Sequence, residues 1–168
     1  MIDFKPVGIE NFWDVLDLSV TETQKEYVFD NALLLAQAKV QPECVPMAVY
    51  AQELLVGFLM YGLDQADGNY WIYHLMIDKT HQRKGYAKET FAKLLQKIQQ
   101  EKKPGKILLL VNKKNVGAIA LYKQFGFKCT GEQFSEHSRG GILYREFFRR
   151  QRIKQKEDLQ ENIMELLF

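Results

Sequence analysis

A strand, a helix and a second strand follow one another in the middle of the chain, and this order constrains the fold most. Tyr70–Ile77 is an aromatic and branched run typical of a central strand. Five successive apolar residues, Ile107–Val111, predict a strand buried on both faces. A strand–helix–strand order predicts a right-handed parallel crossover. Between the strands, one apolar helix face is formed by Ala87, Phe91, Leu94, Leu95 and Ile98.

The segment before this unit predicts antiparallel pairing. We expect a strand over Phe4–Val7 and a helix over Asn11–Leu18, where apolar residues recur at helical spacing. A second helix is expected over Thr21–Lys39, since threonine suits its N-cap. Met47–Tyr50 and Leu54–Tyr61 are apolar, strand-length and separated by a polar pair, which is typical of a hairpin. Together with the crossover, this hairpin predicts a mixed sheet.

The segment after the second buried strand predicts one more helix and two last strands. The helix spans Asn115–Phe125 and stops at glycine, which is favoured beyond helix C-termini. The strands are expected at Phe127–Gly131 and Ile142–Phe147. In the tail, Arg149–Phe168, a helical stripe predicts an extra C-terminal helix that packs on the domain or meets a partner chain; its members are Leu159, Ile163, Leu166 and Leu167.

Length fits one folded domain. Single hydrophobic cores serve about 100 to 200 residues, so the 168 residues predict one domain over 1–148 and a helical extension over 149–168. Apolar residues make up 46% of the chain, enough to bury a core. The expected fold class is α+β (mixed α/β), with a mostly antiparallel twisted sheet of about seven strands flanked by helices.

Charge and cysteine content restrict the partners. The formal charge is +2, too small for a dedicated nucleic-acid binder. No apolar run approaches the roughly 18 residues of a membrane span and no signal core is evident, so we expect no membrane partner and a cytoplasmic location. Cys44 and Cys129 form no CxxC pair, so neither a disulfide framework nor a metal site is expected. Both are expected to be packing residues, with a free thiol as the alternative.

A candidate phosphate-binding turn joins the central strand to the long helix. A helix that opens there presents unpaired backbone N–H groups and the positive end of its dipole, which can hold a diphosphate. Gly85 allows the backbone to approach the anion, and Arg83 and Lys84 add positive charge. Each feature alone also fits a simple turn with solvated cations. The position of the turn favours a ligand, since ligands commonly sit at such strand-to-helix junctions of open α/β sheets.

Two motifs give a family resemblance. Gln82-x-x-Gly85-x-Ala87 resembles the acetyl-CoA signature Q/R-x-x-G-x-G/A of the GNAT superfamily of N-acetyltransferases, with alanine in place of the commoner glycine. Asn115-x-x-Ala118-x-x-Leu121-Tyr122-x-x-x-Gly126-Phe127 resembles the second element of that superfamily. The likeness covers Phe4–Phe147. Within the superfamily, residues 18–31 and 45–50 are similar to bacterial spermine and spermidine acetyltransferases.

The resemblance implies acetyl-CoA as cosubstrate and direct transfer in a ternary complex. The pantetheine arm would enter a splayed opening between the Tyr70–Ile77 and Ile107–Val111 strands and pair with free backbone groups. A backbone N–H near Met76 or Ile77 would polarise the thioester carbonyl. The coenzyme contacts implied are Leu75, Met76, Ile77, Gln82, Arg83, Lys84, Gly85, Tyr86, Ala87, Lys88, Asn115, Ala118 and Tyr122.

Tyr122 is the candidate catalytic residue. The matching family position places a phenol near the coenzyme sulfur, where it can protonate the departing thiolate. An aromatic ring on an apolar helix face can equally be a packing residue. Asn115 is expected to contact the coenzyme or the amine, and its alternative role is to cap its own helix.

Carboxylates are the candidates for binding the acceptor, because a polyamine is protonated near neutral pH. Glu22, Glu26 and Asp30 are four residues apart, which puts three acids on one face of a helix; the alternative is a solvated surface. Glu53 and Glu132 are further candidates, and Glu132 matches an acidic position in the resembling enzymes. The following stretch, 133–141, is longer and more basic than in those enzymes. His74 and His137 are possible bases or packing residues, and His81 is assigned to the coenzyme turn.

Two other functions stay open. The acceptor could be a protein N-terminus, a lysine or an aminoglycoside with the coenzyme unchanged. The chain could instead be a non-catalytic acyl-CoA-binding module whose tail recruits a partner, and a homodimer is possible in either case. A dinucleotide-binding domain is excluded because no G-x-G-x-x-G follows an early strand, and no Walker phosphate loop occurs.

Overall fold

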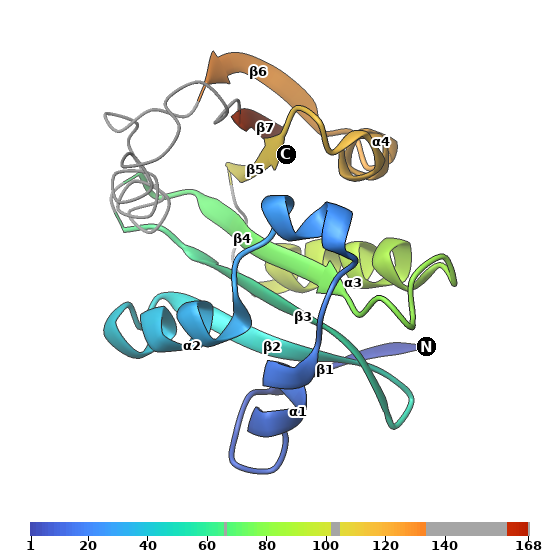
Figure 1. Cartoon of the computed structure of the whole chain (residues 1–168). Coiled ribbons are helices and arrows are strands. Elements are labelled where there is room, and N and C mark those ends of the chain that lie inside the picture. Colours follow the sequence, from blue (N-terminus) through green and yellow to red (C-terminus); the bar gives the residue numbers. More distant parts are fainter. Residues whose placement is uncertain (66, 102–104, 134–160, 168) are drawn as a thin grey trace, which may run out of the picture. The chain divides into compact units, whose positions relative to one another are not determined.

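The computed structural model describes residues 1–65, 67–101, 105–133 and 161–167 (Figure 1). It forms two compact units. The first contains Met1–Gly62 and Ile72–Lys103, and the second contains Leu63–Trp71 and Pro104–Phe168. Each unit has its own strands and at least one helix.

The first unit is built on an antiparallel meander. Its strands are β1 (Ile2–Pro6), β2 (Cys44–Ala51), β3 (Leu54–Leu63) and β4 (Tyr70–Ile77), in that spatial order, with the ends of β3 and β4 and their connecting turn grouped in the second unit. β2 pairs antiparallel with both β1 and β3, which confirms the expected hairpin. Gln52 turns the hairpin with a φ of 60°.

Three α-helices cover this unit: α1 (Phe12–Asp17), α2 (Asn31–Val40) and α3 (Tyr86–Glu101). α2 packs on β2, α3 packs on β1, and α1 contacts α2. The apolar face expected for α3 is confirmed, because Phe91, Leu94 and Ile98 are fully buried. Burial of this face accounts for the helix better than intrinsic propensity does, since short helices in water are marginal without tertiary packing.

Gly57 lets β3 and β4 approach closely. A Cβ at this position would overlap the Met76 carbonyl oxygen and crowd the Ile77 side chain. The Asp78 N–H donates to the Val56 carbonyl oxygen at 2.9 Å, so the contact continues at the end of β4. Glycine in a strand often marks such a close approach of two backbones.

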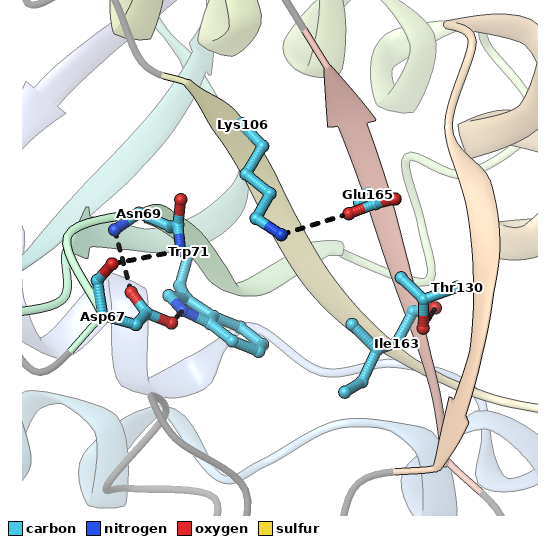
Figure 2. A network of polar contacts seen from close by, with 7 residues as sticks. All are labelled: Asp67, Asn69, Trp71, Lys106, Thr130, Ile163 and Glu165. Carbon is cyan, nitrogen blue, oxygen red and sulfur yellow. Dashed lines mark hydrogen bonds and ion pairs between the residues drawn. The ribbon is translucent and has the colours of Figure 1, made fainter.

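Within the residues that the structure describes, the second unit has a three-stranded antiparallel sheet and one helix. Its elements are β5 (Lys106–Asn112), α4 (Val116–Gln124), β6 (Lys128–Gln133) and β7 (Glu161–Leu167). β7 lies between β5 and β6 and is antiparallel to both. Figure 2 shows two side-chain contacts along β7: the Lys106 Nζ lies 3.4 Å from the Glu165 Oε2, and the Thr130 hydroxyl donates to the Ile163 carbonyl oxygen at 3.3 Å.

The turn before β4 is closed by its own side chains. Asp67 accepts hydrogen bonds from the indole Nε1 of Trp71 at 2.9 Å and from the backbone N–H of Asn69 at 2.8 Å (Figure 2). Trp71 is almost fully buried, and its N–H would be costly without this partner. The turn expected over Asp64–Asn69 is therefore confirmed where it is described.

The expected C-terminal helix is wrong for Glu161–Leu167, which is the strand β7. Ile163 and Met164 are neighbours and both are buried, as in a strand covered on both faces. The apolar positions 163, 166 and 167 also fit helical spacing, and only pairing with β5 and β6 decides for the strand. Leu159 and the strand expected at Ile142–Phe147 lie outside the described residues, and the domain limit at residue 148 stays a prediction.

The single helix expected over Thr21–Lys39 is also wrong. Glu22–Tyr27 forms a 3-10 helix, η1, which ends where Val28 adopts an extended conformation with φ of −130° and ψ of 148°. α2 then starts afresh, with the Asp30 carboxylate accepting from the Ala32 N–H at 2.8 Å. Two separate N-terminal caps, one at Thr21 and one at Asp30, divide the segment into two helices.

The expected fold class is confirmed: the described residues form a mixed α+β structure of seven strands flanked by helices. The pairs β1–β2, β2–β3, β5–β7 and β6–β7 are antiparallel. No helix within the described ranges is long and apolar enough to cross a membrane.

Candidate functional site

The start of α3 has an open backbone geometry. Arg83 and Gly85 both have positive φ, of 62° and 86°. The Gly85 carbonyl oxygen accepts from the N–H groups of Lys88 at 3.0 Å and Glu89 at 3.1 Å, so helical bonding begins there. Glycine has no side chain that could cap the helix, and the first turn of any helix leaves N–H groups without an internal partner. These N–H groups are therefore available to a ligand.

Positive charge surrounds this helix start. Arg83, Lys84 and Lys88 are exposed, and Tyr86 and Ala87 are half-buried beside them. A Cβ at Gly85 would meet nothing within 4 Å, so its backbone faces open space. Turns with successive inward N–H groups form anion-binding concavities. The residues present therefore fit the diphosphate of a nucleotide coenzyme.

Asp78 fixes the loop that leads to α3. Its carboxylate accepts from the Ser19 N–H at 2.8 Å and from the N–H and hydroxyl of Thr80 at 2.9 and 2.6 Å. Burial of the carboxyl group raises its pKa, but these hydrogen bonds together outweigh burial, and the pKa of Asp78 lies below its usual value. Asp78 is therefore an ionised structural anchor.

The side chain of Gln82 is used within the protein. Its Nε2 donates to the Ile77 carbonyl oxygen and to the Gln24 Oε1, each at 2.9 Å. An amide nitrogen carries two hydrogens, so these bonds use both. The first residue of the sequence motif thus ties the end of β4 to η1.

The three residues proposed from β4 behave as core side chains. Met76 and Ile77 are buried, and Leu75 is half-buried. The packing role left open for these side chains is confirmed. Any coenzyme contact from this strand would have to come from its backbone.

The second motif describes a helix that is capped at both ends. At the start of α4, the Asn115 Oδ1 accepts from the Ala118 N–H at 3.1 Å. At its end, the Phe127 N–H donates to the Tyr122 carbonyl oxygen at 3.2 Å and the Gly126 N–H donates to the Lys123 carbonyl oxygen at 3.1 Å, with a positive φ of 87° at Gly126. This is a Schellman motif, and it explains the spacing of tyrosine, glycine and phenylalanine.

The ring of Tyr122 is oriented by this C-terminal cap. It lies 6.2 Å from the buried ring of Phe127, centroid to centroid, at an interplanar angle of 50°. Such a contact between the last helical turn and the residue after the glycine is typical of the motif. Tyr122 itself is only half-buried, so the packing role and a reactive phenol are compatible.

The three acids spaced four apart do not share one helix face. Glu22 forms an ion pair with Lys25 at 2.7 Å, and Lys25 lowers the pKa of the Glu22 carboxyl through a hydrogen bond and its charge. In a 3-10 helix of three residues per turn, Glu22 and Glu26 point about 120° apart. Asp30 caps α2. All three side chains are exposed.

The other two acidic candidates lie on different elements. Glu53 is at the β2–β3 turn and forms an exposed ion pair with Lys5, with the two atoms 3.4 Å apart. Glu132 is in β6, at a register shift in its pairing with β7. Neither position is shown to join the η1 acids.

Burial makes His74 a poor base. Its imidazole is fully enclosed beside the ring of Phe58, and burial lowers its pKa to about 3. The packing role left open for His74 is confirmed. His81 belongs to the α3 loop, as expected, since its N–H donates to the Asp78 carbonyl oxygen at 2.8 Å. His137 lies outside the described residues.

Cysteine and metal chemistry find little support in the described ranges. Cys44 is buried, as expected of a packing residue, whereas Cys129 is an exposed free thiol on β6. No group of three or more His, Cys, Asp and Glu side chains that could hold a metal occurs within those ranges.

Sequence reasoning missed Ser19, Gln24 and Asp78 as parts of the site. Two signals could have found them. Thr21-x-x-Gln24 is a capping box, and both of its reciprocal bonds are present. Asp78 followed two residues later by Thr80 is an Asx turn, which closes on the backbone N–H two residues ahead.

Comparison with known proteins identifies the family. Residues 10–127 match the acetyltransferase (GNAT) family. The chain is 35% identical over 137 residues to a probable spermine N(1)-acetyltransferase of Bacillus subtilis subsp. natto, covering 78% of this chain and 90% of that protein. It is 34% identical, with the same coverage, to the spermine/spermidine N(1)-acetyltransferase of Bacillus subtilis. The chain therefore belongs to the GNAT acetyltransferase family, as the two motifs indicated.

Solved structures agree on the fold. The spermidine N-acetyltransferase of Vibrio cholerae in complex with CoA and spermine superposes with a TM-score of 0.70 at 18% identity, covering 99% of this chain and 95% of that one. Naa50 of Arabidopsis thaliana, in complex with the bisubstrate analogue CoA-Ac-MVNAL, gives 0.67 at 17% identity and covers 99% of each chain. At this identity the likeness extends to the fold alone.

Proposed function

We propose that this chain transfers the acetyl group of acetyl-CoA to a primary amine of a polyamine such as spermidine or spermine. The observation that carries the proposal is its 34–35% identity, over 78% of its length, to two enzymes named as spermine acetyltransferases. The structure supports it with a helix start at α3 that is cationic, uncapped and exposed.

The coenzyme would be held mainly by the α3 start. The N–H groups around Gly85 and the side chains of Arg83 and Lys84 would bind its diphosphate, since helix dipole and cations act on the same anion. Backbone groups of β4 would pair with the pantetheine arm. The complete proposed set is Leu75, Met76, Ile77, Gln82, Arg83, Lys84, Gly85, Tyr86, Ala87, Lys88, Asn115, Ala118 and Tyr122, with Gln82 acting indirectly through Ile77.

Asn115 would contact coenzyme or amine mainly through its Nδ2, which is a donor. Its Oδ1 accepts from the Ala118 N–H and caps the helix. Tyr122 is the proposed catalytic acid: its phenol would give a proton to the departing thiolate of CoA. Bound acetyl-CoA supplies the thioester whose carbonyl carbon the neutral amine attacks directly. His74 is not the base, because its pKa of about 3 is too low to accept a proton from an ammonium group.

The acceptor would be bound by carboxylates, as its cationic nitrogens require. Glu22 and Glu26 project in different directions from η1, which suits an extended polycation better than a single charge. Asp30, at the next helix start, would extend this surface. Glu53 and Glu132 complete the proposed set.

The fold does not determine which amine is the acceptor. One structural neighbour is bound to spermine, and another carries a peptide-linked analogue, at nearly equal TM-scores. Protein or peptide amines therefore remain the second candidate. We further propose a cytoplasmic enzyme that can form a homodimer and needs neither nucleic acid nor membrane.

An acceptor panel tests the proposal. Purified chain, acetyl-CoA and a set of amines would be monitored by thiol release, with spermidine, spermine, a peptide with a free N-terminus, a lysine peptide and an aminoglycoside. We expect the highest kcat/KM with spermidine or spermine. Faster turnover of a peptide amine would contradict the polyamine assignment, and absence of CoA binding by calorimetry would contradict the enzyme.

A further inference from the structure

The 3-10 helix η1 depends on few contacts for its position. It buries no residue in the described structure, so hydrophobic packing contributes little to holding it. Gln24 connects η1 to the loop between β4 and α3, called the coenzyme loop here. The Gln24 Oε1 accepts from the Gln82 Nε2 at 2.9 Å. The same oxygen accepts from the Thr21 N–H at 3.2 Å and the Thr21 hydroxyl at 3.0 Å. The cap of η1 and its link to the loop therefore meet at one atom.

The loop side of this link is equally specific. The Gln82 Nε2 also donates to the carbonyl oxygen of Ile77, the last residue of β4. A single side-chain amide thus joins β4, the coenzyme loop and η1. Arg83, with its φ of 62°, follows directly, so Gln82 is the residue next to the turn.

A second contact holds the base of the same segment and acts differently. Ser19 donates its N–H to the Asp78 carboxylate at 2.8 Å and accepts from the Lys79 N–H at 2.8 Å. These bonds involve the backbone of Ser19, so they anchor the segment whatever the state of η1. The Gln82–Gln24 bond, by contrast, joins two side chains that can separate by rotamer changes.

We infer that Gln24 is a positioning residue that couples the coenzyme loop to the acceptor carboxylates. Through the bond between Gln24 and Gln82, the conformation of the loop that binds the diphosphate sets the orientation of η1. η1 carries Glu22 and Glu26. Coenzyme and amine then strengthen each other's binding. By linkage, the factor by which one ligand raises affinity for the other is the same in both directions. The inference rests on the proposed function, since it takes η1 as the acceptor surface.

The test measures this coupling factor by calorimetry. Affinity for CoA is determined with and without saturating spermidine, for the wild type, Gln24→Met, Gln24→Glu and Thr21→Val. Methionine matches the length of glutamine but lacks the oxygen, and glutamate keeps an acceptor. Thr21→Val weakens the cap of η1 and leaves Gln24 and Gln82 intact.

We expect spermidine to raise CoA affinity at least about fivefold in the wild type, in the usual range of coupled sites. Gln24→Met should reduce the factor to near one; because the factor is the ratio of two CoA affinities of the same variant, a change in CoA affinity without spermidine does not alter this comparison. Gln24→Glu should restore most of the coupling. Thr21→Val should lower the melting temperature but keep the coupling. If Gln24 acted only by stabilising η1, Thr21→Val would reduce the coupling as well.

The outcomes separate the inference from the proposed function. A wild type that binds CoA and acetylates spermidine, but whose coupling is absent or equal in Gln24→Met, overturns the inference and leaves the function intact. A wild type that does not bind CoA contradicts the function itself. If Gln24→Met does not fold, Gln82→Met removes the same bond without touching the cap, and retained coupling in that variant overturns the inference.

Discussion

The starts of α3 and α4 look alike in sequence and differ in what they offer a ligand. Each follows a strand, carries two neighbouring cations and uses an Asx turn: the Asp78 Oδ1 accepts from the Thr80 N–H, and the Asn112 Oδ1 accepts from the Lys114 N–H, each at 2.9 Å. At α4, Asn115 then caps the helix with its own side chain. At α3, the equivalent position is Gly85, which has no side chain to do so.

The difference lies in whether a side chain of the protein already occupies the N–H groups that an anion could bind. A side-chain cap stabilises the helix and competes with the ligand for the same donors. We therefore assign diphosphate binding mainly to α3, and acid catalysis by Tyr122 to α4. The predictions below test this division of roles.

The largest effect is expected from Tyr122→Phe. Loss of a general acid lowers turnover by about 100-fold or more, whereas CoA affinity stays within about twofold because the phenol is not a diphosphate ligand. Steady-state kinetics and calorimetry measure the two quantities. Tyr50→Phe, at a β2 position outside the proposed site, is the control. Near-normal turnover of the Tyr122 variant would leave α4 with no catalytic role.

The next largest effect is a difference between the cation pair before α3 and the cation pair before α4. Arg83→Ala/Lys84→Ala should weaken CoA binding by an order of magnitude or more, since each charge-assisted hydrogen bond contributes about 1.5 kcal/mol or more. The deficit should be greater at low salt, because these side chains are exposed. Lys113→Ala/Lys114→Ala is the matched control at α4. Equal losses in both double variants would show that the uncapped start of α3 confers no advantage.

A smaller effect is expected at Asn115. Asn115→Ala should lower the free energy of unfolding by about 1 kcal/mol, the usual value of an N-cap. Asn115→Asp keeps the capping oxygen and should restore stability, but it removes the Nδ2 donor and adds negative charge, so CoA affinity should fall about threefold. Urea unfolding and calorimetry distinguish the two. Unchanged affinity in the aspartate variant would reduce Asn115 to a cap.

The smallest effect is a difference in acid sensitivity between the two loops. The pKa of Asp78 lies below its ordinary value, so its stabilisation is complete above that ordinary value and is lost as pH falls through the folded-state pKa. Urea unfolding at pH 5, 4 and 3 should show a loss that Asp78→Asn lacks. Asp14→Asn, at an exposed position of α1, controls for the general removal of an acid. The Asn112 side chain that closes the turn before α4 is neutral, so no such loss is expected from it. Identical acid profiles for the wild type and Asp78→Asn would exclude this difference.

Long, strongly patterned elements were predictable from the sequence. Tyr70–Ile77 coincides with β4, and the apolar face of α3 is buried where the spacing placed it. The stop at Gly126 was also predictable, because glycine at that position permits a positive φ that other residues adopt only with strain. In each case the local pattern and the tertiary environment favour the same structure.

Predictions failed where two structures share one pattern. Ile163, Leu166 and Leu167 satisfy a helical stripe, yet they form a strand because β5 and β6 present unpaired backbone groups on both sides. The acids Glu22, Glu26 and Asp30 have helical spacing, but the capping box at Thr21 and the cap at Asp30 split the segment. Local hydrogen bonds thereby outweighed the average helical propensity of the stretch.

The sequence by itself determined the family, the glycine turn before α3 and the capped helix that carries Tyr122, because each depends on residues close together in the chain. Only the tertiary structure decided that β7 is a strand, that His74 is too enclosed to act as a base, and that Gln82 reaches Gln24. Those contacts join residues far apart in the chain, 58 positions apart in the case of the glutamine pair. Spacing within one segment carries no information about them, because burial and long-range hydrogen bonds depend on which segments fold together.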